Sequence, residues 1–202
     1  MKKNVKNILI LNGSSSGANG NCNELIKSVL HRAQALDLPI RLNFEVIHLA
    51  QSGRVSIVKR QIKKADAFIF VTGTYWDSWG SPLQKFLEDV TDLEGTSAFL
   101  GKPSFVFVLN HSVGGKGLLS RLQGVLSTLG CLVPPMSGWV YSLVTHLALN
   151  SNRKSKHVDD FWSPSDLDII LQNLSLSLSI DLKWASWPID RKNFKAQWFV
   201  DK

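Results

Sequence analysis

Three short runs of almost purely apolar residues constrain this chain more than any other feature. They cover residues 6–12, 67–72 and 103–110. A strand that is apolar at nearly every position, rather than at every second one, is typical of a parallel sheet that is covered on both faces. A helical pattern follows each run, and this β-α-β-α-β order predicts a parallel sheet with helices on both faces.

The remaining patterns complete a single domain over residues 1–202. Residues 41–49 alternate polar and apolar, as an edge strand would, and residues 131–140 form a further extended segment. Residues 141–162 fit no single pattern, although their polar middle, 150–156, looks like a loop. A last helix and a Trp-rich tail occupy residues 163–202. Helices are predicted at residues 23–36, 56–64, 81–91, 118–129 and 163–180, with Ser81 as the N-cap of the third.

Composition excludes several classes of protein. With 44% apolar and 19% charged residues the chain is globular, and no apolar run reaches the about 18 residues of a membrane span. We therefore expect a cytoplasmic protein. The net charge is +7, but the basic residues are spread along the chain, which favours solvated faces over nucleic-acid binding. The spacing of its His residues predicts no metal site, and Cys22 and Cys131 do not predict a disulfide framework.

Three loops follow the carboxyl ends of the apolar strands, at residues 13–22, 73–81 and 111–117. In a parallel sheet these loops meet at one edge, which is where ligands bind. The first loop is rich in Gly, Ser and Asn and leads into a helix, so its amide groups and the helix dipole converge. The sequence therefore predicts a site for a phosphate group.

The first loop does not fit the common phosphate-binding templates. It contains neither G-x-x-x-x-G-K-[ST] nor G-x-G-x-x-G. Residues 13–17 do fit G-x-S-x-G, the nucleophile elbow of serine hydrolases. His111 could serve as the base, but the acid is harder to place, so a hydrolase stays a distant alternative.

Sequence motifs at all three loops resemble the NAD(P)H-dependent FMN reductases. The similarity runs from about residue 6 to residue 140 and includes Gly13-Ser14, the run from Asn19 to Leu25, and Gly101-Lys102-Pro103. It also includes Tyr75 ahead of Pro82-Leu83 in the second loop. The resemblance implies a flavodoxin-like three-layer α/β/α sandwich with five parallel strands in the order 2-1-3-4-5.

The resemblance also implies a function. Hydride would pass from NAD(P)H to FMN and on to a small acceptor such as a quinone, without a catalytic side chain. A homodimer or homotetramer is expected, with no nucleic acid and no membrane as partner. The residues expected to bind the cofactor are Ser14, Ser16, Asn19, Asn21, Cys22, Thr72, Gly73, Thr74, Tyr75, Trp76, Asp77, His111, Ser112, Gly114 and Gly115.

Aromatic side chains in the second loop support a flat ligand independently of the resemblance. Tyr75, Trp76 and Trp79 could wall an isoalloxazine ring, although an aromatic-rich surface loop that closes onto the core is the simpler alternative. Cys22 lies at a predicted helix start, which would lower the pKa of its thiol and make it an oxidant sensor; an inert pocket lining is the alternative.

Two other functions and one assembly question stay open. A non-enzymatic FMN electron carrier would share the fold. A relative that has lost FMN would explain why the Arg that the family often has near Ser16 is missing. The Leu residues at 167, 171, 174 and 178 share a helix face, which with the Trp tail predicts either a dimer interface or packing on the sheet.

Overall fold

The computed structural model describes residues 5–53, 55–151 and 163–188. Five parallel strands form one sheet in the order β2-β1-β3-β4-β5, which confirms the predicted flavodoxin-like fold class. The strands are β1 (Val5–Asn12), β2 (Arg41–His48), β3 (Ala67–Gly73), β4 (Ser104–Asn110) and β5 (Gly138–Ser142).

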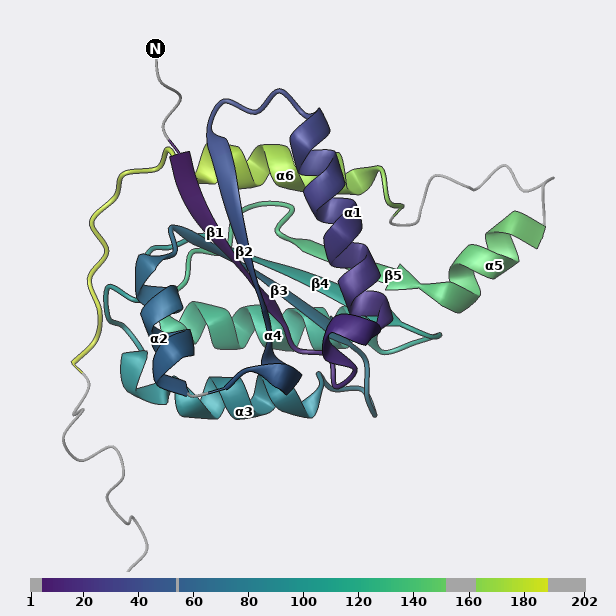
Figure 1. Cartoon of the computed structure of the whole chain (residues 1–202), viewed down its shortest axis with the longest axis horizontal. Coiled ribbons are helices and arrows are strands. Elements are labelled where there is room, and N and C mark those ends of the chain that lie inside the picture. The colour runs from purple at the N-terminus through teal and green to yellow at the C-terminus, as the bar shows by residue number, and fades with distance from the viewer. Residues whose placement is uncertain (1–4, 54, 152–162, 189–202) are drawn as a thin grey trace, which may run out of the picture.

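Helices cover both faces of this sheet (Figure 1). Helices α1 and α6 lie on one face, and α2, α3 and α4 lie on the other. The helices are α1 (Asn21–Ala35), α2 (Val55–Lys64), α3 (Ser81–Asp89), α4 (Gly115–Leu129), α5 (Leu143–Ser151) and α6 (Asp166–Ser177), with 3-10 turns η1 (Gly17–Asn19), η2 (Leu49–Gln51) and η3 (Thr91–Leu93). Within the described segments, none of the helices is long and apolar enough to cross a membrane.

The central strands divide their side chains between two cores. Leu9 and Phe70 pack with α2, α3 and α4, whereas their neighbours Ile10 and Ile69 pack with α1 and α6. All four side chains are at most 1% exposed. Because both sides of the pleat are buried, both positions must be apolar, which explains the apolar runs.

The Leu face of the last helix packs inside the chain rather than forming a dimer interface. Leu167, Leu171 and Leu174 are fully buried against the sheet, and Leu178 packs at the edge of the same core. Arg32 of α1 pairs with Asp168 of α6 at 2.8 Å. The prediction of an interface on this face is therefore wrong, because the sheet already covers it.

Helix boundaries near glycines differ from the prediction. The N-cap of α3 is Gly80, not Ser81, which lies inside the helix. Helix α4 begins at Gly115 rather than at residue 118, because Gly114 in the left-handed region (φ 88°) turns the chain directly into it. Strand β5 covers only the end of the extended segment predicted over 131–140 and continues past it. Helix α5 occupies residues 143–151 of the ambiguous stretch, and most of the predicted loop at 150–156 lies outside the described residues.

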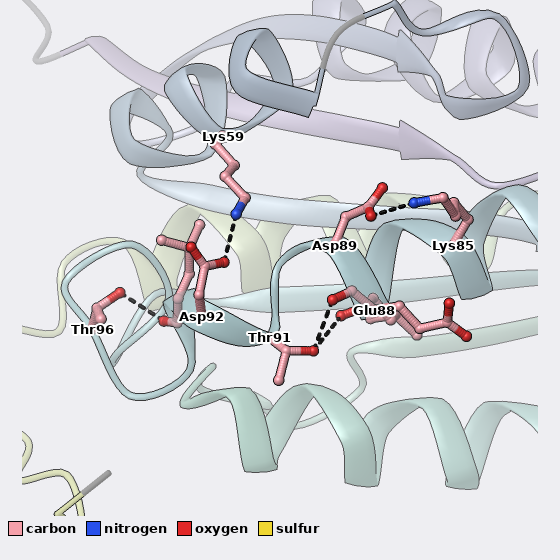
Figure 2. A network of polar contacts seen from close by, with 9 residues as sticks. Lys59, Lys85, Glu88, Asp89, Thr91, Asp92 and Thr96 are labelled. Atoms are coloured by element: carbon pink, nitrogen blue, oxygen red, sulfur yellow. Dashed lines mark hydrogen bonds and ion pairs between the residues drawn. The ribbon is translucent and has the colours of Figure 1, made fainter. Parts of the chain in front are cut away.

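Polar contacts hold the α2–α3 layer together (Figure 2). Lys59 of α2 reaches Asp92 in η3 at 2.6 Å, and Lys85 pairs with Asp89 along α3. The Thr91 hydroxyl donates to the Glu88 carbonyl oxygen at 2.9 Å where α3 ends. These contacts fix α3, whose first turn follows directly after the second loop.

Candidate functional site

A cavity of about 570 Å³ opens where the carboxyl ends of the strands meet. It lies where the strand order reverses between β1 and β3, the usual ligand position in an open α/β sheet. Its lining residues come from all three predicted loops and from α1, β4, β5, α5 and α6: Ser14, Ser16, Asn21, Cys22, Leu25, Ser28, Gly73, Thr74, Tyr75, Leu109, Asn110, His111, Trp139, Tyr141, Leu143, Pro164 and Leu167.

The first loop (residues 13–20) and the start of α1 form the part of the cavity that suits an anion. Ser14, Ser16 and Asn21 line it with hydroxyl and amide groups. The N-cap residue Gly20 makes no side-chain cap hydrogen bond, and Asn21 and Cys22 in the first turn of α1 line the cavity. The positive end of the helix dipole adds to this attraction.

The second loop is a tight hairpin. Tyr75 and Ser78 exchange two backbone hydrogen bonds of 2.7 and 2.9 Å, which leaves Trp76 and Asp77 at the tip with φ of 48° and 57°. Left-handed backbone costs a non-glycine residue about 1–2 kcal/mol. The hairpin therefore stores strain directly after Tyr75, which lines the cavity, and such strain is commonly found at functional sites.

The Tyr75 side chain joins the second loop to the first. Its hydroxyl oxygen accepts a hydrogen bond from Ser15 Oγ at 3.0 Å and lies 3.3 Å from Ser14 Oγ. Ser15, the nucleophile position of the G-x-S-x-G pattern, therefore bonds to a Tyr hydroxyl rather than to a His base. This contact argues against the hydrolase alternative.

Two buried polar atoms at this edge have no hydrogen-bond partner in the described part of the chain. They are Thr74 Oγ1, from the second loop, and Asn110 Oδ1, at the end of β4. Buried polar atoms are nearly always hydrogen-bonded, so two that are not, in one cavity, fit a ligand that supplies the missing partners. A flavin ring, with apolar faces and a polar edge, meets this requirement.

The apolar wall of the cavity was not predicted from the sequence. Trp139 and Tyr141 stack on β5 with their ring centroids 5.7 Å apart, and Leu25, Leu109 and Leu143 complete the wall. The two aromatic residues at alternate positions of β5 are the signal in the sequence, but the predicted extended segment ends at residue 140 and so excludes Tyr141.

Seven predicted residues do not line the cavity: Asn19, Thr72, Trp76, Asp77, Ser112, Gly114 and Gly115. Some of them shape it. The Thr72 hydroxyl accepts a hydrogen bond from the Gly80 amide at 3.1 Å. Asp77 lies so close to Gly114 that a Cβ there would come within 2.2 Å of its Oδ1, which explains the glycine. Trp76 is fully exposed at the hairpin tip.

Cys22 is a buried wall residue rather than a reactive thiol. Burial raises the pKa of the Cys22 thiol to about 11, and a hydrogen bond with Ser14 offsets only part of this rise. The raised pKa contradicts the predicted low value and supports the alternative of an inert pocket lining, because burial disfavours the thiolate. No cluster of metal-ligating side chains occurs among the residues that the structure describes.

Solved structures with the same fold include flavin enzymes and flavodoxins. An NADH:FMN oxidoreductase (EmoB, apo form) is 20% identical over 87% of this chain and 91% of its own, with a TM-score of 0.65. RosB bound to 8-demethyl-8-formylriboflavin-5′-phosphate is 13% identical over 86% of this chain and 79% of its own, with a TM-score of 0.65. A flavodoxin from the domain Archaea is 12% identical over 85% of this chain and 98% of its own, with a TM-score of 0.57. At these identities the similarity establishes the fold alone.

The sequence itself carries the assignment to a family. No protein of curated function matches it. The family described as NADPH-dependent FMN reductase matches residues 6–145, which is more than half of the chain and includes all three loops. The chain therefore belongs to the NADPH-dependent FMN reductase family.

Proposed function

We propose that this protein binds FMN in the cavity at the carboxyl edge of the sheet and oxidises NAD(P)H there, passing the electrons to a small acceptor such as a quinone. The observation that carries the proposal is the pair of unpartnered buried atoms, Thr74 Oγ1 and Asn110 Oδ1, in a largely apolar cavity. Membership of an FMN reductase family supports it.

Each part of the cavity suits one part of the cofactor. Ser14, Ser16 and the first turn of α1 would hold the phosphate, and Thr74 and Asn110 would meet the polar edge of the ring. Trp139, Tyr141, Leu25 and Leu143 would pack on its apolar surface. Bound FMN supplies the hydride chemistry, so the protein needs to position two flat rings and requires no nucleophile of its own.

The phosphate would be held by neutral donors. None of the side chains that the structure places in the cavity lining is a Lys, Arg, Asp or Glu. Hydroxyl groups, amide groups and the helix dipole therefore take the place of the Arg that the family often has, and the net charge of +7 attracts the anion from a distance. The missing Arg alone is thus no reason to conclude that FMN binding has been lost.

The test is the visible spectrum of the protein after reconstitution with FMN and removal of free flavin, followed by anaerobic addition of NADPH or NADH. A retained flavin band that bleaches within seconds supports the reductase. A retained band that persists with both nucleotides indicates an electron carrier. Absence of a retained band, together with no FMN-dependent turnover of NAD(P)H, would refute the proposal in favour of a relative that has lost FMN.

The quaternary structure is a further part of the proposal. Helix α5 extends from the body of the fold (Figure 1), and its first residue, Leu143, lines the cavity. Leu143, Val144 and Leu147 on this helix are 41–57% exposed. An exposed apolar surface of this kind is typical of an interface, and we propose that a second copy of the chain covers it in a homodimer. Elution at the monomer mass in gel filtration would remove this part of the proposal.

A further inference from the structure

We infer that Asn12 and His48 are positioning residues that hold the first loop in the shape that binds the phosphate of FMN. The inference rests on the proposed function. The two residues end the neighbouring strands β1 and β2 and lie opposite each other in the register of the sheet. Neither lines the cavity, so both act through the loop.

The Asn12 side chain is completely buried and makes three hydrogen bonds. Its Oδ1 accepts from the Ser14 amide at 3.1 Å, and its Nδ2 donates to the Gly17 carbonyl oxygen at 3.0 Å. The third contact joins Nδ2 to His48 Nδ1 at 3.0 Å. One side chain therefore fixes the loop at two positions, on either side of Ser15 and Ser16.

These contacts determine the orientation of both side chains. A backbone N–H can only donate and a backbone carbonyl can only accept, so Ser14 and Gly17 together fix which end of the Asn12 amide is oxygen. Nδ2 of Asn12 can then only donate to His48, so Nδ1 of His48 is the acceptor. Neutral His48 therefore carries its proton on Nε2, and its role is to accept the second Asn12 proton.

A second contact from the same side completes this support. Gln51 in η2 accepts a hydrogen bond from the Ala18 amide through Oε1 at 3.2 Å. Gly17 has a φ of 52°, and a Cβ there would come within 2.9 Å of Gln51 Oε1. The end of β2 and the turn after it thus hold the first loop from outside the cavity.

Support of this kind matters most for an anion. With its carbonyl bonded to Asn12, Gly17 has no oxygen free to turn toward the phosphate, and with its amide bonded to Asn12, Ser14 presents its hydroxyl instead. Preorganised donors bind an anion well because they need no rearrangement on binding, whereas a released carbonyl oxygen repels it. The flavin ring would lie against other residues, so its binding should be insensitive to this support.

The experiment compares FMN with riboflavin, which has the same ring and no phosphate, by titration of flavin fluorescence. In His48→Leu the affinity for FMN should fall about tenfold, while the affinity for riboflavin changes less than about twofold. His48→Asn, whose Oδ1 can accept the same proton, should restore the FMN affinity. Gln51→Ala, at an exposed position, should weaken the binding of FMN relative to that of riboflavin without disturbing the core.

The matched control lies at the other end of the same two strands. Asn43 donates to Asn7 Oδ1 at 2.9 Å, also as a register pair of β1 and β2, and Asn43→Ala should leave both affinities unchanged. Equal losses for FMN and riboflavin, an unchanged FMN affinity in His48→Leu and Gln51→Ala, or failure of His48→Asn to restore binding would overturn the inference. A wild-type protein that binds neither flavin would instead refute the proposed function.

Discussion

The two ends of the sheet differ in whether their polar groups have hydrogen-bond partners within the chain. At the carboxyl end, Thr74 Oγ1 and Asn110 Oδ1 are buried without partners, and Trp76 and Asp77 adopt left-handed backbone around a cavity of about 570 Å³. Each of these features costs stability. Unpartnered buried polar atoms and strained backbone are typical of a ligand-binding site.

At the amino end, polar groups are paired within the chain. Lys102 Nζ donates to the Ile62 and Lys63 carbonyl oxygens in the last turn of α2, at 3.2 and 3.4 Å, and burial lowers the pKa of this lysine. Trp187 Nε1 donates to Glu94 Oε1 at 3.1 Å. Trp184 packs on Gly101 and, with Trp187, borders a smaller cavity of about 290 Å³.

The difference separates residues that stabilise the fold from residues that prepare a site. Substitutions at the amino end should change stability and leave flavin binding unchanged. Substitutions at the carboxyl end should change flavin binding, and one of them, Thr74→Val, should do so with a gain in stability.

The largest expected effect concerns the two thiols, one at each end. Burial raises the pKa of Cys22 to about 11 and that of Cys131 to about 12, from 9.0. At pH 8 Cys22 should therefore react with iodoacetamide about 100-fold more slowly than in the unfolded chain, and Cys131 about tenfold more slowly again. Peptide mapping by mass spectrometry measures both rates in one sample.

FMN provides the control for this measurement. It should slow the labelling of Cys22 further and leave Cys131 unchanged. Both raised values mean that the native state keeps protons that the unfolded state releases, so stability should fall as the pH rises from about 9 toward 11. Labelling of Cys22 at the rate of the unfolded chain would contradict its burial.

The next effect tests the contact between the first and second loops. A Cβ on Gly80 would lie 2.4 Å from the Gly13 carbonyl oxygen, a backbone atom that cannot move aside cheaply. Gly80→Ala should lower the free energy of unfolding by about 1–3 kcal/mol and abolish retention of FMN. Urea denaturation and the flavin spectrum measure the two effects.

Gly124→Ala is the matched control, because nothing lies within 4 Å of its Cβ position inside α4. It should leave FMN retention unchanged and raise the stability by up to about 1 kcal/mol. Native stability and native flavin retention in Gly80→Ala would show that the two loops are not held together as described.

A smaller effect distinguishes an unpartnered hydroxyl from a partnered one. Thr74→Val replaces the orphaned hydroxyl with a methyl group of similar size, so it should be neutral or stabilising by up to about 1 kcal/mol, yet weaken FMN binding. At the amino end, buried Ser104 Oγ donates to the Leu132 carbonyl oxygen at 3.3 Å. Ser104→Ala should lower the free energy of unfolding by about 1 kcal/mol and bind FMN with native affinity. A destabilised Thr74→Val with native affinity would reverse the comparison.

The smallest effect is expected at the tail. Trp187 is 58% exposed, and its bond to Glu94 is at the surface. Trp187→Phe should therefore shift the free energy of unfolding by no more than about 0.5 kcal/mol and leave flavin binding unchanged. A change in FMN affinity measured by fluorescence titration would mean that the two ends are coupled.

Sequence reasoning succeeded where a single physical requirement dominates. The central strands β1, β3 and β4 are buried on both faces, so their apolar runs are unambiguous, and the order of elements then fixes where the three loops meet. It failed where packing decides. The glycines around Gly115 indicate a loop where α4 in fact begins. The prolines before β5 interrupt the extended pattern, so the bounds of the strand that carries Trp139 and Tyr141 are not predicted.

Burial and cross-strand contacts could not be predicted either. A position at a helix start suggested a reactive Cys22, but its exposed fraction of 3% depends on α1 packing on the sheet. In the sequence Asn12 is simply the last residue of a predicted strand, and its contact with His48 forms only because β2 lies beside β1. Such roles depend on the register of the sheet, which one sequence does not reveal.

Hydrogen–deuterium exchange with and without FMN tests the central claim most directly. We expect added protection at residues 13–22, 73–80 and 110–115, at the carboxyl end of the sheet. Residues 95–102, 127–133 and 184–187, at the amino end, should exchange at the same rate in both samples. Protection concentrated at the amino end, around the cavity bordered by Trp184 and Trp187, would contradict the assignment of the flavin site.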